Sequence, residues 1–315
     1  MVDDEQLSRS KAIHRRTGRT FYYATRLLPE RVRQATYVLY AFFRVADEVV
    51  DDAEGLSAAE QRERLEAIRE AALTGETDDP VLVAFAELRE RYDIPEEEVT
   101  VFVDAMLTDI ETSRYETYEE LEAYMRGSAA AVGVMMTYVM RPDDPDEAIP
   151  AARRLGEAFQ MTNFLRDVRE DVVERDRIYL PRETLERHGV TSEQIERLEY
   201  DEAFAAAVRE ELRRTESLYH EGVAGIGLLP MDCQLPVLTA AVLYADHHRL
   251  VRERDYDVLS ETPSLSTLRK LRLVAETRWH WFWNKDPEAV FAKVSAVPSG
   301  TQRRHDHPGE PLPAR

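Results

Sequence analysis

Apolar residues recur every three or four positions along most of the chain, and this is the period of an amphipathic α-helix. The sequence holds no sustained apolar–polar alternation bounded by turn residues, which is the pattern of a strand. We therefore expect an all-α fold. The predicted helices span 5–16, 19–28, 31–53, 57–75, 79–91, 96–113, 117–140, 147–173, 182–187, 192–196, 200–224, 232–254 and 264–293.

The chain of 315 residues is 43% hydrophobic, which is enough for one sizeable core. We expect a single helical domain over residues 1–296. The segment 297–315 is rich in Pro, Gly and charge, and we expect it to be disordered. No apolar run reaches the length of a membrane span, and the N-terminus does not look like a signal peptide. The single Cys233 fits a reducing cytoplasm.

Acidic residues outnumber basic ones by 61 to 41, and the formal net charge is −20. One interpretation is an ordinary acidic protein. The one we favour is adaptation to very high salt, where screening removes the repulsion between surface carboxylates. Nucleic-acid binding is not expected, because the sequence holds no basic stripe that could meet phosphates.

One candidate for chemistry is a polar stripe in the predicted helix 147–173. Gln160, Asn163, Asp167 and Asp171 are spaced by three, four and four residues, so they share one helical face. Their neighbours are mostly apolar, which predicts burial. Two carboxylates buried side by side are costly unless a cation neutralises them. An isolated pair with this spacing is usually a solvated face, but this setting favours a divalent-metal site.

A second stripe lies in the predicted helix 31–53. Tyr37, Tyr40, Arg44, Asp47 and Asp51 are spaced by three, four, three and four residues, so they also share one helical face. Arg44 stands one turn before Asp47 and can either pair with a carboxylate or grip a diphosphate, and the sequence leaves both open. Two acidic faces opposed across a bundle would form an all-oxygen cage for hard divalent cations. Such a cage suits a reaction in which a diphosphate leaves.

Several separate segments resemble, in the same order, the phytoene/squalene synthase family. The most specific runs from Gln160 to Asp171 and is followed by Arg177-Ile178-Tyr179-Leu180-Pro181. The other segments are Thr20 to Pro29, Tyr37 to Asp51, Met106 to Asp109 with Arg114-Tyr115, Tyr124 to Gly133, Tyr244, and Tyr256 to Val258. The resemblance covers roughly residues 10–275. Ser128 stands where the family usually has Val and Ala130 where it usually has Gly, which puts the shape of the pocket in doubt.

The resemblance implies a single helical bundle with a central apolar cavity, of the isoprenoid synthase type. It implies isoprenyl diphosphate substrates and bound Mg²⁺, with Mn²⁺ as an alternative. The implied metal ligands are Asp47, Asp51, Asn163, Asp167 and Asp171, and the four aspartates with Tyr124, beside the reacting carbons, form the implied catalytic set. The implied substrate contacts are Thr17, Gly18, Arg19, Thr20, Phe21, Thr25, Tyr40, Arg44, Gln160, Arg166 and Tyr244.

The implied reaction is the head-to-head condensation of two geranylgeranyl diphosphates to phytoene through a cyclopropyl diphosphate, without NADPH. Thr25 lies four residues after Phe21, and a small residue there leaves room for the longer chain. The alternatives are squalene or dehydrosqualene formation from farnesyl diphosphate. From a different class, the chain could be a non-catalytic helical scaffold or binding module.

Two clusters lie outside these motifs. Trp279, Trp281 and Trp283 with Phe282 are first interpreted as packing of the last helix on the core. The alternative is docking on a membrane, with peripheral contact for product release. His247-His248 and His305-Asp306-His307 have no evident metal partners, and we expect both groups at the surface.

If the acidic composition is a salt adaptation, molar KCl should raise the melting temperature by screening the repulsion between surplus carboxylates. Thermal unfolding followed by circular dichroism between about 0.1 and 2 M KCl measures this. A melting temperature that stays flat or falls over that range would reject the adaptation.

Overall fold

The computed structural model describes residues 25–51 and 55–299. The predicted site residues Thr17, Gly18, Arg19, Thr20 and Phe21 lie outside the described residues, as do His305 and His307 and the predicted helix 5–16. Most of the predicted tail also lies outside them. Among its first residues, Val297 is buried and the Pro298 carbonyl accepts a hydrogen bond from His220 Nε2 at 3.1 Å. The division into a domain and a tail stays a prediction.

The expected all-α fold is confirmed. Within the described residues the sole β-type pairing is an isolated bridge between Arg114 and Ile178. The α-helices are α3 (Glu30–Asp51), α4 (Ala58–Thr74), α5 (Pro80–Arg91), α6 (Glu96–Thr108), α7 (Tyr118–Met125), α8 (Ala131–Met140), α9 (Pro145–Arg166), α10 (Val168–Arg175), α11 (Arg182–Arg187), α12 (Ser192–Glu196), α13 (Glu202–Ala224), α14 (Met231–Glu253), α15 (Thr267–Trp283) and α16 (Pro287–Val294). A π-helical turn, η1 (Arg126–Ala130), joins α7 to α8, and a 3₁₀ turn, η2 (Gly225–Leu228), follows α13.

The predicted helix 117–140 is divided by η1 into α7 and α8, and three other predicted helices are divided or shortened. The predicted helix 147–173 is broken at Asp167, whose ψ of 13° turns the chain between α9 and α10. The predicted helix 264–293 is two helices, because Asp286 caps a new helix in which Pro287 takes the first turn. The predicted helix 96–113 already ends at Thr108.

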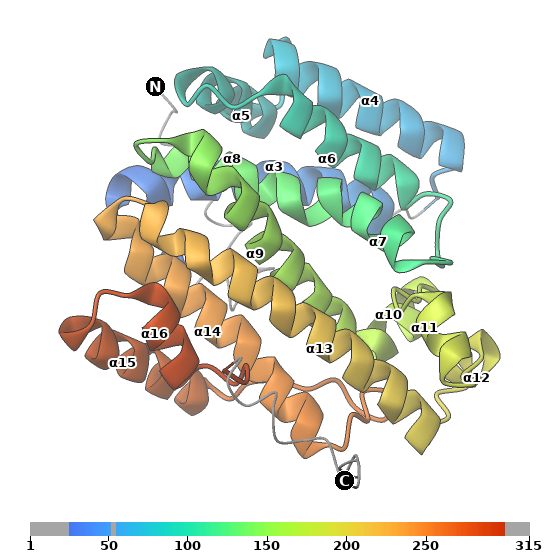
Figure 1. Cartoon of the computed structure of the whole chain (residues 1–315). Coiled ribbons are helices and arrows are strands. Elements are labelled where there is room, and N and C mark those ends of the chain that lie inside the picture. Colours follow the sequence, from blue (N-terminus) through green and yellow to red (C-terminus); the bar gives the residue numbers. More distant parts are fainter. Residues whose placement is uncertain (1–24, 52–54, 300–315) are drawn as a thin grey trace, which may run out of the picture.

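The helix α9 runs through the middle of the bundle, with α8 and α6 on one side and α13 and α14 on the other (Figure 1). Two glycines let its neighbours come close. A Cβ atom on Gly133 of α8 would lie 2.5 Å from the Ala152 carbonyl oxygen, and one on Gly222 of α13 would lie 2.6 Å from the Leu155 nitrogen. These contacts leave no space for a larger residue, so α9 is held tightly on both sides.

No helix among the described residues is both long enough and apolar enough to cross a membrane.

The three tryptophans near the end of the chain differ in their burial. Trp281 is buried, so core packing is correct for that residue. Trp279 and Trp283 are exposed, and for them the expectation of core packing was wrong, since they lie on the outer side of α15.

Candidate functional site

A cavity of about 710 Å³ lies beside α9 and is also lined by α3, α8 and α14. Its walls are largely apolar, with Leu39, Phe43 and Val132 among them. The structure brings all of the described substrate-contact candidates to this one cavity. The predicted site residues that line it are Thr25, Tyr40, Arg44, Asp47, Gln160, Asn163, Arg166 and Tyr244.

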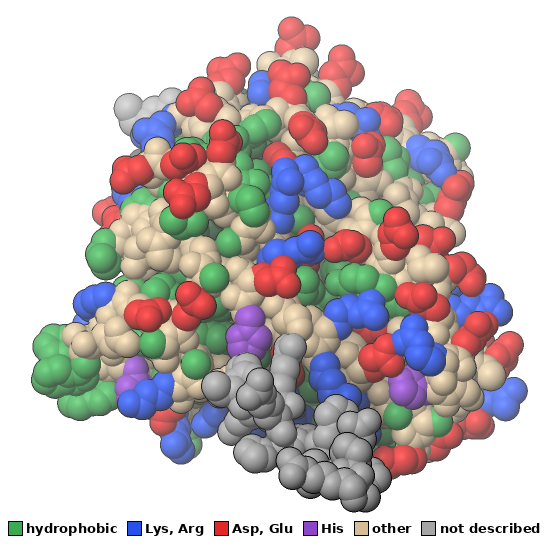
Figure 2. Space-filling model, viewed as in Figure 1, with side chains coloured by type: hydrophobic (Ala, Val, Ile, Leu, Met, Phe, Trp, Pro, Cys, Tyr) green, Lys and Arg blue, Asp and Glu red, His purple; other side chains and the backbone are tan. Residues whose placement is uncertain are grey.

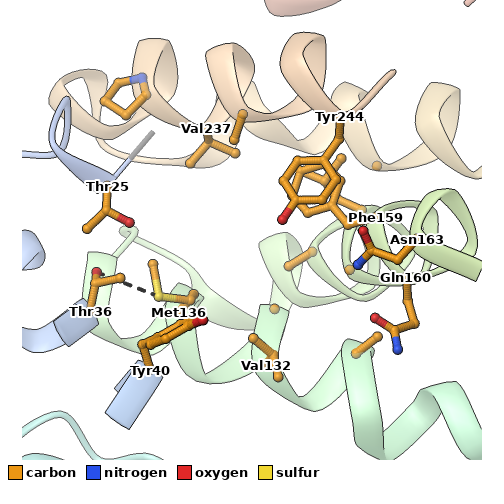
Figure 3. Close-up of a pocket in the computed structure, with 18 of the residues that line it drawn as sticks. Thr25, Thr36, Tyr40, Val132, Met136, Phe159, Gln160, Asn163, Val237 and Tyr244 are labelled. Atoms are coloured by element: carbon orange, nitrogen blue, oxygen red, sulfur yellow. Dashed lines mark hydrogen bonds between the residues drawn. The ribbon is translucent and has the colours of Figure 1, made fainter. Parts of the chain in front are cut away.

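The two amide side chains of the wall and Thr25 lie on opposite sides of the cavity. In Figure 3 the amides of Gln160 and Asn163 lie on one side of the cavity, close to Tyr244 and Phe159. Tyr244 stacks on Phe159 with ring centroids 4.6 Å apart. Thr25 lies on the opposite side, and it is buried. A ligand with a charged head and a long apolar chain would match this division.

The first aspartate stripe is a network of ion pairs at the end of α3. Arg44 Nη1 lies 3.9 Å from Asp47 Oδ2 and 3.7 Å from Asp51 Oδ2, and its Nε lies 3.3 Å from Glu48. Of the two roles open to Arg44, the structure therefore records the carboxylate pairing. Asp47 itself lines the cavity, and 42% of its side chain is exposed. The carboxylate of Asp47 is thus available to a ligand.

The second stripe faces the first, and one arginine joins them. Arg175 Nη1 lies 3.2 Å from Asp171 Oδ1, while its Nε lies 3.8 Å from Asp51 Oδ1. Asp167 sits at the break between α9 and α10, where Arg166 Nε donates to its Oδ1 at 2.6 Å. Backbone hydrogen bonds of 2.8 Å continue through the break, from Asp167 N to Asn163 O and from Asp171 N to Asp167 O. The helical turn therefore continues through the break, but of the predicted stripe only Gln160 and Asn163 line the cavity, while Asp167 and Asp171 lie outside its lining.

A further carboxylate, that of Asp109, which the predicted site did not include, lies next to these motifs. Arg177 Nη1 lies 3.6 Å from Asp51 Oδ1 and 3.9 Å from Asp109 Oδ2. Asp109 and Arg177 belong to segments that carried the family resemblance, so that signal could have identified them. Arg175 belongs to none of those segments, and neither does Lys270, which lines the cavity.

Negative charge at this site is only partly compensated. Burial, followed by repulsion from Asp167, raises the pKa of Asp171 to about 7 against the attraction of Arg175. Burial likewise raises the pKa of Asp109 to about 6, although Arg177 opposes it. The Asp47 carboxyl opens to the cavity but is held away from bulk water, and this desolvation, followed by repulsion from Asp51, raises its pKa to about 7. The site would therefore gain from additional positive charge.

The donor set fits a hard divalent cation, although a closed cage is not formed. Among the described residues, no three His, Cys, Asp or Glu side chains gather closely enough to hold a metal ion. Instead, arginines stand between the opposed aspartates. The donors are carboxylate and amide oxygens, which Mg²⁺ prefers, and Asp109 Oδ1 has no hydrogen-bond partner in the described part of the chain.

Tyr124 lies in an aromatic cluster, and it is not among the residues that line the cavity. Its hydroxyl donates to Asp109 Oδ2 at 2.7 Å, and its ring stacks near Tyr179 and Phe164. Burial raises the pKa of Tyr124 well above its ordinary value. The side chain therefore positions Asp109, and contact with reacting carbons stays a prediction.

The histidine pair is buried, so the expected surface location was wrong. His247 lines the cavity, and its Nδ1 lies 3.0 Å from the Tyr244 carbonyl oxygen. His248 Nε2 lies 3.0 Å from Thr162 Oγ1, which is in turn 2.9 Å from the Tyr219 hydroxyl. Because adjacent residues of a helix point in different directions, α14 contributes one histidine to the cavity and the other to a polar contact with α9 and α13.

The bundle and its opposed aspartate motifs define the isoprenoid synthase fold. The chain belongs to the squalene/phytoene synthase family, whose model matches residues 14–269. A phytoene synthase of Cereibacter sphaeroides is 32% identical over 286 residues, which cover 87% of this chain and 79% of that protein. A phytoene synthase of Thermus thermophilus is 33% identical over 255 residues, which cover 81% of this chain and 86% of that protein.

Solved structures agree with this family. A dehydrosqualene synthase in complex with a ligand superposes with a TM-score of 0.81 and 27% identity, over 89% of this chain and 98% of that chain. The squalene synthase HpnC of Alicyclobacillus acidocaldarius gives a TM-score of 0.73 with 23% identity, over 80% of this chain and 95% of that chain. This second likeness concerns the fold alone. The family is one of prenyltransferases, and this chain is therefore an enzyme of that class.

The buried His248 predicts a pH dependence of stability. Burial lowers its pKa to about 3, below the unfolded value near 6.5. Its contribution to the free energy of unfolding is therefore complete above about pH 6.5 and is lost as the pH falls towards 3. His248→Gln should make the fall in stability between about pH 6 and 4 shallower, by up to about 1.4 kcal/mol per pH unit. Urea unfolding at several pH values measures this, and identical slopes in both proteins would contradict it.

Proposed function

We propose that this enzyme condenses two geranylgeranyl diphosphates head to head to form phytoene, through a cyclopropyl diphosphate. The supporting observation is one cavity that joins charged and amide side chains of both aspartate stripes to an apolar wall reaching Thr25. The phytoene synthases to which the chain is similar support the same product. The solved dehydrosqualene and squalene synthases keep farnesyl diphosphate as the alternative substrate.

We propose that Asp47, Asp51, Asn163, Asp167 and Asp171 hold Mg²⁺, with Mn²⁺ as a possible replacement. Bound Mg²⁺ would supply positive charge to the leaving diphosphate. The raised pKa values of Asp47 and Asp171 support this assignment, since both carboxylates need a cation to ionise at low cost. Arg44 and Arg166 line the cavity beside them and would bind diphosphate oxygens through their guanidinium groups.

The apolar part of the cavity would hold the prenyl chains and exclude water from the cationic intermediates. A condensation that ends by proton loss needs no reductant, so we do not expect NADPH to be required. Thr17, Gly18, Arg19, Thr20 and Phe21 remain proposed contacts of the diphosphates and chains, and Tyr124 remains a proposed neighbour of the reacting carbons.

We also propose a cytoplasmic enzyme that contacts a membrane peripherally, because phytoene is a hydrocarbon that needs an apolar acceptor on release. The excess of acidic residues supports the proposal that this enzyme works at high salt.

Product identification tests the proposed reaction. Purified protein with Mg²⁺ would be incubated with farnesyl or geranylgeranyl diphosphate, each with and without NADPH. We expect phytoene from the C20 substrate, independent of NADPH. Squalene that appears only with NADPH, or dehydrosqualene as the main product, would favour the C15 alternative. Release of no hydrocarbon from either substrate would revive the scaffold interpretation.

Asp167→Asn keeps the size of the side chain and removes one charge at the break between α9 and α10. We expect turnover to fall at least about 10²-fold, on the order of 3 kcal/mol, with the fold intact. Asp47→Asn should behave alike. Asp143→Asn removes a charge from an exposed loop and serves as the control. Turnover close to the wild type in Asp167→Asn at saturating substrate would remove the proposed role of the aspartates.

Thr25→Phe should shorten the cavity. Thr25 is buried in its wall, on the side opposite Gln160 and Asn163. Overpacking there should lower kcat/KM for geranylgeranyl diphosphate far more than for farnesyl diphosphate, because only the longer chain reaches that depth. Thr25→Val keeps the size and controls for loss of the hydroxyl. Equal losses on both substrates would show that Thr25 does not measure chain length.

A further inference from the structure

Helix α15 has two apolar faces, and one of them is uncovered. Leu273, Thr277 and Trp281 are buried, and the helix packs on α14 and α16. On the opposite side an exposed row of apolar residues follows the spacing 3, 4, 4 and 3, which is one stripe along a helix. The row consists of Leu268, Leu271, Ala275, Trp279 and Phe282. We call this row, together with Trp283, the α15 stripe.

The α15 stripe holds most of the exposed large hydrophobic side chains in the described structure. Nine such side chains are exposed there, and five belong to α15. Trp279 is 62% exposed and Trp283 71%, and the Trp283 ring meets both Trp279 and Phe282 edge-on. Figure 2 shows hydrophobic side chains gathered at its lower left, where Figure 1 places the end of α15. A contiguous patch of this kind marks an interaction surface.

The charge of α15 is opposite to that of the chain as a whole. The helix contains four Lys or Arg residues and one Glu, in a protein with a formal net charge of −20. Arg269 is bound to Asp246 of α14 at 2.7 Å and holds the helix in place. Arg278 and Arg272 are exposed on the two sides of the stripe, and Arg272 Nε also donates to Glu276 at 2.7 Å. Apolar residues flanked by cations are the composition of a helix that lies on an anionic lipid surface.

The start of α15 is also part of the cavity wall. Leu265, just before the helix, and Lys270, in its first turns, both line the cavity. The same short segment therefore connects the apolar chamber with the exposed stripe. A membrane lying against the stripe would be close to the chamber that holds prenyl chains.

We propose that the α15 stripe is the surface by which this enzyme lies on an anionic lipid bilayer. A second copy of the chain is the less suitable occupant, because a two-fold contact through the stripe would bring the flanking Arg272 and Arg278 of both copies together. Trp279, Phe282 and Trp283 enter the interfacial region, and the arginines meet lipid phosphates. The inference rests on the proposed function in one respect only. The proposed function identifies the molecules exchanged with the bilayer, which are the prenyl substrate and the hydrocarbon product.

The test is binding of the protein to lipid vesicles in the absence of substrate. Binding is measured by co-sedimentation and by the tryptophan fluorescence emission, to which Trp279 and Trp283 contribute. Vesicles of phosphatidylcholine with phosphatidylglycerol should bind the wild type and shift its emission to shorter wavelength. Replacing Trp279, Phe282 and Trp283 together by Gln should weaken binding at least about 100-fold at both 0.1 and 2 M KCl. Val173→Gln, at a side chain that is also 62% exposed but belongs to α10, should bind as the wild type does.

A second variant separates the cations from the apolar stripe. Arg272→Glu with Arg278→Glu should weaken binding about tenfold or more at 0.1 M KCl and little at 2 M, because salt screens the attraction to lipid phosphates. Circular dichroism at each salt concentration checks the helical fold. If the protein is unfolded at 0.1 M KCl, vesicle binding of the triple Gln variant at 2 M KCl is the test of the proposal.

The proposal is overturned if the wild type does not bind these vesicles, or if the triple Gln variant binds equally well. It is also overturned if sedimentation shows that the wild type is a dimer and the triple variant a monomer, since the stripe would then be an interface between copies. Turnover with detergent-dispersed substrate keeps the two proposals apart. Failed vesicle binding with intact turnover removes the lipid surface alone, and absent turnover with intact binding removes the proposed reaction alone.

Discussion

The burial and crowding of carboxylates around Arg175 and Arg177 is the constraint on which the site depends. Asp51, Asp109 and Asp171 come from three different helices or their ends, and no apolar packing could hold them together without compensating charge. Arg175 and Arg177 supply part of that charge by bridging pairs of aspartates. Burial, followed by repulsion from neighbouring aspartates, still raises the pKa of Asp109 and Asp171, and a divalent cation with an anionic diphosphate would lower this electrostatic cost.

Such a site needs a rigid frame, and the close packing of α9 provides it. Gly133 and Gly222 bring the neighbouring helices against the backbone of α9, so the positions of Gln160 and Asn163 are fixed by main-chain contacts. The same helix separates the cavity from the buried contact of Thr162 with His248 and Tyr219. The binding side chains are thus attached to the least deformable part of the bundle.

Local patterns predicted the helices and the two acidic stripes, because both depend on spacing within one segment. The short helices 182–187 and 192–196 were predicted with the bounds of α11 and α12. Spacing could not predict Arg175 as the bridge between the stripes, because that contact joins segments far apart in sequence. It also missed the break at Asp167 and the burial of His247 and His248, since a backbone torsion and a helix interface leave no periodic signal.

We propose that the opposed aspartates and the cavity arginines form one site for a metal-bound diphosphate. Thermal unfolding with Mg²⁺ alone, inorganic diphosphate alone and both together tests this site without turnover. We expect a clear rise in melting temperature only with both ligands, since each supplies the charge that the other needs, and stabilisation of about 3 kcal/mol at 100 times the dissociation constant. The rise should vanish in Asp171→Asn. An equal melting temperature in all conditions, or an equal rise in the variant, would contradict the claim.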